Sequence, residues 1–206
     1  MGLGWRLNLP SIQRRTDKGL PYYTDYPNLD GVDNDQDGEI DEPDEWDTFI
    51  YSSGEDLIPL ADGTFRPKNE SDFSRFQRDG AGWLATQSDG TRLRFGTTPE
   101  GRIQDSTGRI FRWLLESMED TNGNRIAFTH AKLDDSNQRY CRLIQYNGAM
   151  QVELVYEARP DPFVDYRPRF PLKTAYRPRL GGRRFDPPGT VQFPEPRHAA
   201  GGPKQR

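Results

Sequence analysis

Three β-hairpins within residues 73–156 constrain the fold of this chain more than any other feature. In each, two runs rich in alternating apolar and polar residues flank a short turn that contains Asp-Gly or Asn-Gly. These dipeptides favour tight hairpin turns because they tolerate the positive φ that such turns require. The paired runs are 82–87 with 91–96 around Gly90, 110–115 with 125–130 around residues 120–124, and 140–146 with 151–156 around Gly148. The pattern predicts an all-β fold, an antiparallel meander of hairpins.

Shorter strands are expected on both sides of the meander. Trp5, Leu7 and Leu9 alternate with polar residues, which predicts a strand within residues 1–11 that buries one face. A polar turn is expected at 13–20 and a polar connection at 65–70. Two short strands are predicted at 48–51 and 56–60, and residues 172–176 can add one more.

The composition predicts a thin hydrophobic core. Only 33% of the residues are hydrophobic and the mean hydropathy is -0.95. A sheet with one dry face needs less apolar material than a two-layer α/β core. We therefore expect one β domain in residues 1–176 and a disordered Pro/Gly/Arg-rich tail in 177–206. Such a tail buries too little apolar surface to offset an ordering cost of about 1–2 kcal/mol per residue.

Charge is distributed unevenly along the chain. Residues 30–47 contain ten acidic residues and no basic one, whereas residues 157–206 contain 11 Lys or Arg against 5 Asp or Glu. The basic residues of the C-terminal part lie among prolines and are not interleaved with aromatic residues, so the pattern does not favour nucleic-acid binding. No run of 18 apolar residues predicts a membrane span, and the N-terminus does not have the layout of a signal peptide.

The acidic stretch 30–47, which we call the acidic loop, predicts a structural Ca²⁺ site. Ca²⁺ prefers six to eight oxygen ligands, and aspartates at alternate positions converge when the chain curls around the ion. Gly38 permits the sharp bend, and Glu39 offers its backbone carbonyl. The predicted ligands are Asp33, Asp35, Asp37, Glu39, Asp41 and Asp44, at positions 1, 3, 5, 7, 9 and 12 of a calcium-loop pattern. Position 12 departs from the usual Glu, and the alternative is a solvated acidic insertion.

Catalytic patterns do not emerge from the sequence. The two histidines are His130, on a predicted strand, and His198, in the predicted tail. Neither a nucleophile elbow nor a phosphate-binding loop is present, since the glycines occur one per turn. The single cysteine, Cys141, lies on a predicted strand and is expected to be a buried, inert thiol. We therefore predict that the chain is not an enzyme.

Several segments together resemble a known family. They are 4–12 (Gly-Trp-Arg-Leu-Asn-Leu-Pro-Ser-Ile), 18–21, 47–50, 54–60, the Asp89-Gly90-Thr91 turn, residues 120–124 and 166–170. In order and spacing they are similar to the N-terminal domain of the virulence-plasmid B protein family (SpvB-like), which includes B components of insecticidal toxin complexes. The hairpin at 120–124 also resembles the tyrosine–aspartate repeats of the RHS family. The acidic loop departs from this pattern as an insertion.

The resemblance implies a structural function. In toxin complexes the B component and its partner form a β-built shell around a toxic effector, so the chain is expected to be a non-catalytic part of a larger shell. Its expected partner is the remainder of that shell, in the same or another chain. Secretion as part of a toxin assembly is expected, and no active-site residue of the family transfers to this sequence.

Other functions compatible with the sequence are also considered. The chain could be a stand-alone secreted Ca²⁺-dependent β module for adhesion or carbohydrate binding. It could also be a truncated, non-functional reading frame, with residues 180–206 out of frame. A β-rich hydrolase that uses carboxylates is the least favoured alternative.

Overall fold

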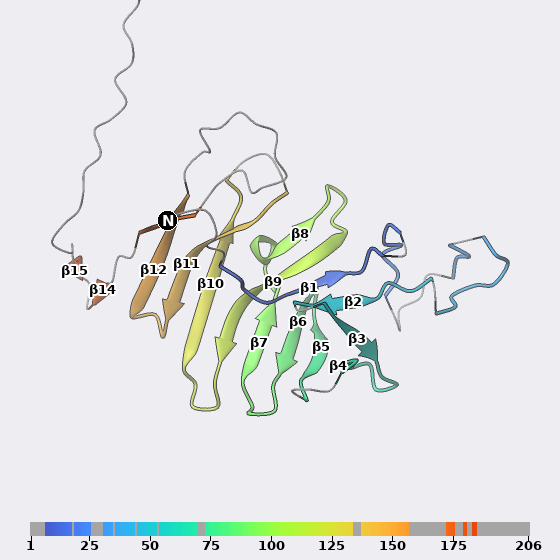
Figure 1. The fold of residues 1–206 in the computed structure, drawn as a ribbon, viewed down its shortest axis with the longest axis horizontal. Coiled ribbons are helices and arrows are strands. Elements are labelled where there is room, and N and C mark those ends of the chain that lie inside the picture. Colours follow the sequence, from blue (N-terminus) through green and yellow to red (C-terminus); the bar gives the residue numbers. More distant parts are fainter. Residues whose placement is uncertain are drawn as a thin grey trace, which may run out of the picture.

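The computed structural model describes residues 7–17, 19–25, 31–34, 36–43, 45–52, 54–69, 73–133 and 137–156 (Figure 1). It also describes the backbone of three short strands, 172–175, 179–180 and 183–184. The predicted all-β class is confirmed, because the regular elements of these residues are antiparallel strands apart from one 3₁₀ turn, η1 (Pro99–Gly101).

Fifteen strands are assigned within the described part of the chain. They are β1 (Ser11–Arg14), β2 (Phe49–Tyr51), β3 (Glu55–Pro59), β4 (Phe65–Pro67), β5 (Arg75–Asp79), β6 (Gly82–Thr86), β7 (Arg92–Phe95), β8 (Arg102–Gln104), β9 (Ile110–Glu119), β10 (Arg125–Ala131), β11 (Tyr140–Tyr146), β12 (Met150–Tyr156), β13 (Leu172–Ala175), β14 (Arg179–Leu180) and β15 (Arg183–Arg184). The first thirteen belong to one sheet, and β14 pairs with β15.

The sheet closes on itself. Strands β1 to β7 pair in chain order, β7 pairs with β9, and β9 pairs with β1, so that these eight strands form a ring that we call the barrel. The closing contact joins residues far apart in sequence, since Ile12 lies opposite Trp113. Closure removes the exposed sheet edges that an open meander would leave.

Strand β9 also belongs to a second part of the sheet. Its C-terminal half pairs with both β7 and β10, and its N-terminal half pairs with both β1 and β8. Strands β10 to β13 continue the sheet beyond the barrel as an extension that we call the wing (Figure 1). The long strand β9 therefore connects the barrel and the wing through continuous backbone pairing.

Aspartates close the turns of the sheet. At the turn between β9 and β10, Asp120 accepts hydrogen bonds from the backbone N–H groups of Asn122 and Asn124, at 2.8 and 2.9 Å. Asp105 makes the equivalent bonds to Thr107 and Arg109, both at 2.9 Å, between β8 and β9. Glycine follows in a left-handed conformation, because a residue with a Cβ is strained there. The predicted turns at residues 90, 123 and 148 are confirmed, with φ of 85°, 82° and 69°.

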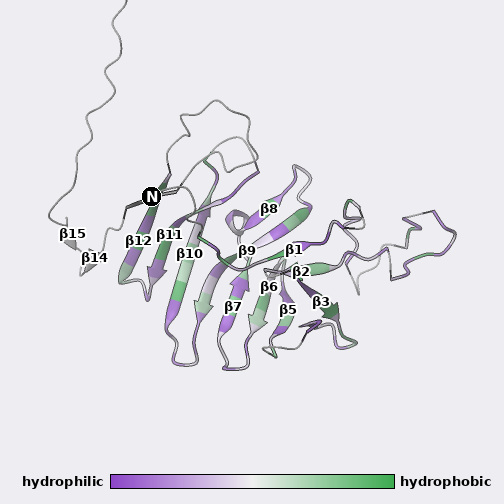
Figure 2. Cartoon of the chain, in the orientation of Figure 1, coloured by the Kyte–Doolittle hydropathy of each residue, from purple (hydrophilic) through white to green (hydrophobic). Residues whose placement is uncertain are grey.

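An aromatic core fills the barrel. The rings of Phe49 and Phe65 each lie 5.0 Å from that of Trp83, which lies 5.9 Å from Trp113, and all three contacts are edge-on. Trp83 and Trp113 are fully buried, at 0% and 1% exposure. Edge-on aromatic pairs add about 0.5–1.5 kcal/mol each beyond the burial of their area. Figure 2 shows hydrophobic and hydrophilic residues alternating along strands such as β9 and β10.

Three expectations need correction. Among the described residues the first strand is β1, which begins at Ser11, and residues 7–10 are not in a strand, while residues 1–6 of the predicted strand lie outside the described part of the chain. The polar turn expected at 13–20 therefore overlaps β1, and residues 65–70 contain β4. Strand β8 was not predicted. β1 was misplaced because one of its two buried residues is Arg14, and a buried arginine breaks the apolar alternation.

Candidate functional site

A cluster of paired charges lies at one end of the barrel. Arg14 comes from the last position of β1 and Arg78 from β5. Asp25 precedes the acidic loop and Asp47 is the last residue of the loop, and a 2.9 Å hydrogen bond from the Asp47 N–H to the Thr24 carbonyl joins these two ends. The barrel therefore brings four charged residues together over its aromatic core.

Arg14 is the most buried member, with 5% of its side chain exposed. It forms ion pairs with Asp25 and with Asp47, the latter at 2.5 Å, and its Nε donates to the Ile110 carbonyl at 2.8 Å. Its guanidinium lies 5.3 Å from the centre of the Phe49 ring. A buried charge is tolerated only when it is paired and hydrogen-bonded, and Arg14 meets both conditions.

Asp47 is also buried, with 5% of its side chain exposed. Besides Arg14, it accepts hydrogen bonds from the backbone N–H groups of Tyr22 and Tyr23, at 3.0 and 2.7 Å. Burial raises the pKa of Asp47, while the charge of Arg14 and the two amide groups oppose that rise. The carboxylate thus fixes the segment before the acidic loop to the last residue of the loop.

Arg78 packs against the aromatic core. Its guanidinium lies 4.1 Å from the centre of the Trp83 ring and 4.9 Å from that of Trp113. It pairs with Asp25, which it shares with Arg14. Burial lowers the pKa of Arg78 to about 10, an effect that the charge of Asp25 opposes. Contacts of this kind contribute about 0.5–2 kcal/mol, more as the cation is more desolvated, and the Arg78 side chain is 28% exposed.

A pocket of about 370 Å³ opens beside the cluster. Its wall includes the three arginines Arg14, Arg78 and Arg109, with Asp25 and Trp113. Arg109 stands on the turn before β9, and its guanidinium lies 4.7 Å from the centre of the Tyr23 ring. Sequence patterns gave no indication of this pocket, because its residues are distant in the chain.

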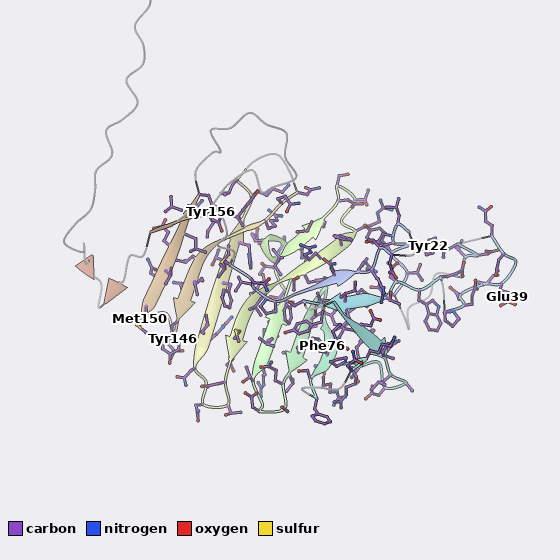
Figure 3. The ribbon with its side chains drawn as sticks, in the orientation of Figure 1. Tyr22, Glu39, Phe76, Tyr146, Met150 and Tyr156 are labelled. Carbon is purple, nitrogen blue, oxygen red and sulfur yellow. The ribbon has the colours of Figure 1, made fainter. Side chains whose placement is uncertain are left out.

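The acidic loop extends away from the barrel, with Glu39 near its tip (Figure 3). Its carboxylates cap backbone N–H groups: Asp33 accepts from Gln36 and Gly38 at 2.6 and 3.0 Å, Asp37 from Glu39 at 2.8 Å, and Asp41 from Gly31 at 3.1 Å. Two of the six predicted ligands, Asp35 and Asp44, lie outside the described residues.

The predicted calcium site is not tested by this arrangement. In the part of the chain that the structure describes, no three His, Cys, Asp or Glu residues are grouped closely enough to hold a metal ion. The sequence pattern also missed Glu45, which is fully buried and accepts from the backbone N–H of Asn34 and, at 2.7 Å, of Asp41. Calcium binding stays a prediction.

His130 has a structural environment. It lies beside Glu116 in a pocket of about 330 Å³, but its Nε2 donates to the Leu115 carbonyl at 2.7 Å. Burial lowers its pKa. Glu116 accepts hydrogen bonds from both backbone and hydroxyl groups of Thr97 and Thr98. Glu116 is therefore held by the two threonines, while its charge partly opposes the lowering of the His130 pKa and the Nδ1 of His130 is buried without a hydrogen-bond partner among the described residues. His198 lies outside the described residues.

Cys141 is buried, as predicted. Only 7% of the residue is exposed, and burial raises the pKa of its thiol to about 11. A thiol with a raised pKa carries little thiolate near neutral pH and is therefore a poor nucleophile.

The fold and the charge cluster define a class of all-β domain, a closed antiparallel barrel that shares one strand with a sheet extension. The same fold occurs in the N-terminal domain of the effector protein SpvB from Salmonella typhimurium strain LT2, with a TM-score of 0.54 and 20% identity over 82% of this chain and 67% of that chain. It also occurs in the Photorhabdus luminescens Tc holotoxin pore, with a TM-score of 0.57 and 22% identity over 85% of this chain and 10% of that chain.

The chain belongs to the family of the Salmonella virulence plasmid 65kDa B protein, SpvB, whose sequence profile matches residues 1–153. This confirms the predicted resemblance. The mono(ADP-ribosyl)transferase SpvB of Salmonella typhimurium is 25% identical in a 185-residue alignment that covers 75% of this chain and 31% of the relative. The chain therefore spans about a third of the length of the curated relatives it matches. None of the described residues forms a helix with the length and apolarity needed to span a bilayer.

Proposed function

We propose that this chain is a non-catalytic structural domain that builds part of the wall of a toxin-complex-like assembly. Its partner would be the remainder of the shell, in the same or another chain, and the assembly would act outside the producing cell. Membership of the SpvB family supports this proposal, and so does a fold shared with the TcdB2–TccC3–Cdc42 structure at a TM-score of 0.58.

The observation that carries the proposal is the wing. Because β9 pairs with strands of both the barrel and the wing, the sheet continues past a unit that is already closed. A closed barrel needs no additional strands to satisfy its own backbone. The wing is therefore best explained as the surface on which neighbouring parts of a larger assembly pack.

One row of the wing leaves apolar side chains exposed. Ile126, Tyr146 and Met150 lie opposite one another on β10, β11 and β12, so they share one face of the sheet. Tyr146 and Met150 are 38% and 47% exposed, and both lie at the same end of the wing (Figure 3). Aromatic and methionine side chains are enriched where proteins associate, which fits a contact at this row.

The row offers a test of the proposal. Replacing Tyr146 and Met150 by serine should weaken the association of this chain with the remaining segments of a family member, measured by analytical ultracentrifugation. The matched control replaces Ile58, which is 43% exposed on β3 of the barrel, and should leave association unchanged. If the wing variant associates as strongly as the wild-type chain does, the proposed wall contact through the wing is contradicted.

The non-catalytic part of the proposal concerns ADP-ribosyl transfer. Relatives of this chain are named mono(ADP-ribosyl)transferases, but the chain aligns with 31% of their length. Its fold is that of a solved N-terminal domain of SpvB. We infer that the transferase chemistry of those relatives belongs to another part of their sequence. The purified chain should consume no more NAD than a buffer blank does. NAD consumption by the native chain that disappears when the chain is denatured would overturn the inference.

We further propose that Ca²⁺ orders the acidic loop. Alternating aspartates and the left-handed bend at Gly38, with φ of 101°, support this proposal. The ion would neutralise part of the repulsion among ten acidic residues in residues 30–47. Its role would be structural, because the loop projects away from the barrel.

A further inference from the structure

The pocket at the end of the barrel has an excess of positive charge in its wall. Three arginines line it, Arg14, Arg78 and Arg109, against the single carboxylate of Asp25. Asp47 pairs with Arg14 and Asp105 pairs with Arg109, but neither aspartate lines the pocket. The lining itself thus contains three guanidinium groups and one carboxylate, while Asp47 and Asp105 pair with Arg14 and Arg109 from outside it.

The hydrogen-bond donors of Arg78 are incompletely used. A guanidinium carries five N–H donors in a planar fork. Among the described residues Arg78 donates only through Nη2, to Asp25, and that carboxylate also accepts from Arg14. The N–H donors of a guanidinium lie in its plane, so the donors of Arg78 that Asp25 does not use extend from the edges of the group. Its side chain is 28% exposed, so these donors are accessible.

The rim of the pocket leaves room for a ligand. Gly63, Gly80 and Gly108 line it from three different turns, and a Cβ built on any of them meets no atom within 4 Å. Trp113 and Phe65 contribute apolar wall. Sites for small-molecule ligands usually combine a partly apolar pocket with a few polar groups that converge on it.

We propose that this pocket binds one carboxylate group, which accepts hydrogen bonds from the free edge of Arg78 and from Arg109. Guanidinium groups favour carboxylates because the two planar groups match in a bidentate arrangement. The carboxylate can belong to a free small acid or to a glutamate or aspartate side chain of a neighbouring polypeptide. The proposal does not depend on the shell function, since the site is complete within the barrel.

The test compares two probes that differ only in charge and hydrogen bonding at one group. Titrations use the α-amide of N-acetylglutamate and its glutamine counterpart at equal ionic strength, with tryptophan fluorescence as the readout because Trp113 lines the pocket. The glutamate probe should bind at least about tenfold more tightly, a difference of about 1.4 kcal/mol. Equal binding of both probes, or binding of neither, would overturn the proposal.

Arginine variants locate the site. Arg78→Gln and Arg109→Gln should each weaken binding of the glutamate probe at least about tenfold, which corresponds to about 1.4 kcal/mol. The control is Arg94→Gln, an exposed strand arginine that pairs with Asp79 outside the pocket, and it should bind as the wild type does. The Arg109 side chain is 58% exposed, so its replacement should not disturb the fold. If Arg78→Gln does not fold, the affinity of Arg109→Gln for the glutamate probe tests the proposal.

The source of the carboxylate is separated by a third probe. A short glutamate-rich peptide that binds at least about tenfold more tightly than the single glutamate derivative indicates a polypeptide partner, and equal affinities indicate a free acid. Unchanged affinity in both the Arg109→Gln and Arg94→Gln variants would contradict the assignment to this pocket.

Discussion

Replacing Arg14 by methionine removes the residue that joins the charge cluster to the barrel. The change deletes the ion pairs to Asp25 and Asp47 and the hydrogen bond to the Ile110 carbonyl. Removing one partner of a buried pair costs about 3–5 kcal/mol, because the other charge stays buried. Asp25 retains Arg78, and Asp47 retains two backbone N–H groups, so we expect a loss near the lower end, about 3 kcal/mol.

The assay is urea unfolding at pH 7.5, followed by tryptophan fluorescence. Trp83 and Trp113 are both buried in the barrel and report its opening directly. The matched control is Arg94→Met, whose pair with Asp79 is 44% and 40% exposed. Exposed pairs contribute about 0–1 kcal/mol, so the control should unfold close to the wild type.

The pH dependence of the loss gives a second signature. Burial already raises the pKa of Asp47 in the folded state, and removing Arg14 takes away the charge that opposes this rise. A raised folded pKa contributes stability that is present at low pH and is lost as the pH rises through that pKa. The difference between Arg14→Met and wild type should therefore shrink as the pH falls toward 4. Adding Asp47→Asn should recover part of the loss at pH 7.5.

Two results would refute this reasoning. One is a loss for Arg14→Met no larger than that for the Arg94→Met control. The other is a full loss that is independent of pH and unchanged by Asp47→Asn, which would indicate a packing defect instead of an unpaired buried carboxylate.

Three further predictions follow from the turns, the barrel packing and the acidic loop. Gly82→Ala should lose about 1–3 kcal/mol in urea unfolding, because a Cβ there lies 2.6 Å from the Phe95 carbonyl oxygen. Gly123→Ala, with φ of 82° and nothing within 4 Å, should lose about 1–2 kcal/mol through backbone strain alone. No loss for Gly82→Ala would contradict the close packing at residue 82, and no loss for Gly123→Ala would contradict the left-handed turn. Hydrogen bonds lower the pKa of Asp120, so its contribution is present above the ordinary value of 3.8 and is lost as pH falls below it. In the Asp120→Asn variant the unfolding temperature should therefore fall less steeply with decreasing pH than in the wild type. The same slope in both proteins would argue against this contribution of Asp120. Ca²⁺ at about 10⁻³ M should protect the acidic loop from proteolysis, and EDTA should reverse this protection. The same rate of cleavage in Ca²⁺ and in EDTA would contradict the site, and so would protection of the Asp37→Asn variant by Ca²⁺ as strong as that of the wild type.

Local features of the sequence predicted the turns and missed the closure. Asp-x-Asn-Gly and Asn-Gly act within four or five residues, so Gly123 and Gly148 could be placed from the sequence alone. The pairing of Ile12 with Trp113 depends on the whole intervening chain. Pattern reading had no means to detect it, and therefore predicted a meander without recognising that it closes into a barrel.

The candidate site was missed for a related reason. Arg14 and Arg78 lie in short strands, where the alternation of apolar and polar residues predicts that an arginine side chain faces solvent. They become interior groups only because the aromatic rings of Phe49, Trp83 and Trp113 supply flat surfaces for their guanidinium groups. The density of aspartates in the acidic loop drew the metal prediction instead, since charge clustering is visible in sequence and long-range pairing is not.

The most direct measurement of the structural role is an assembly experiment in a family member. The segment equivalent to residues 1–153 is deleted from a toxin-complex B component, and this chain is supplied in trans while particles are counted by electron microscopy. We expect that the deletion abolishes closed shells and that this chain restores them, without any consumption of NAD. Shells that close equally well without the segment would contradict the proposal that this domain builds part of the wall.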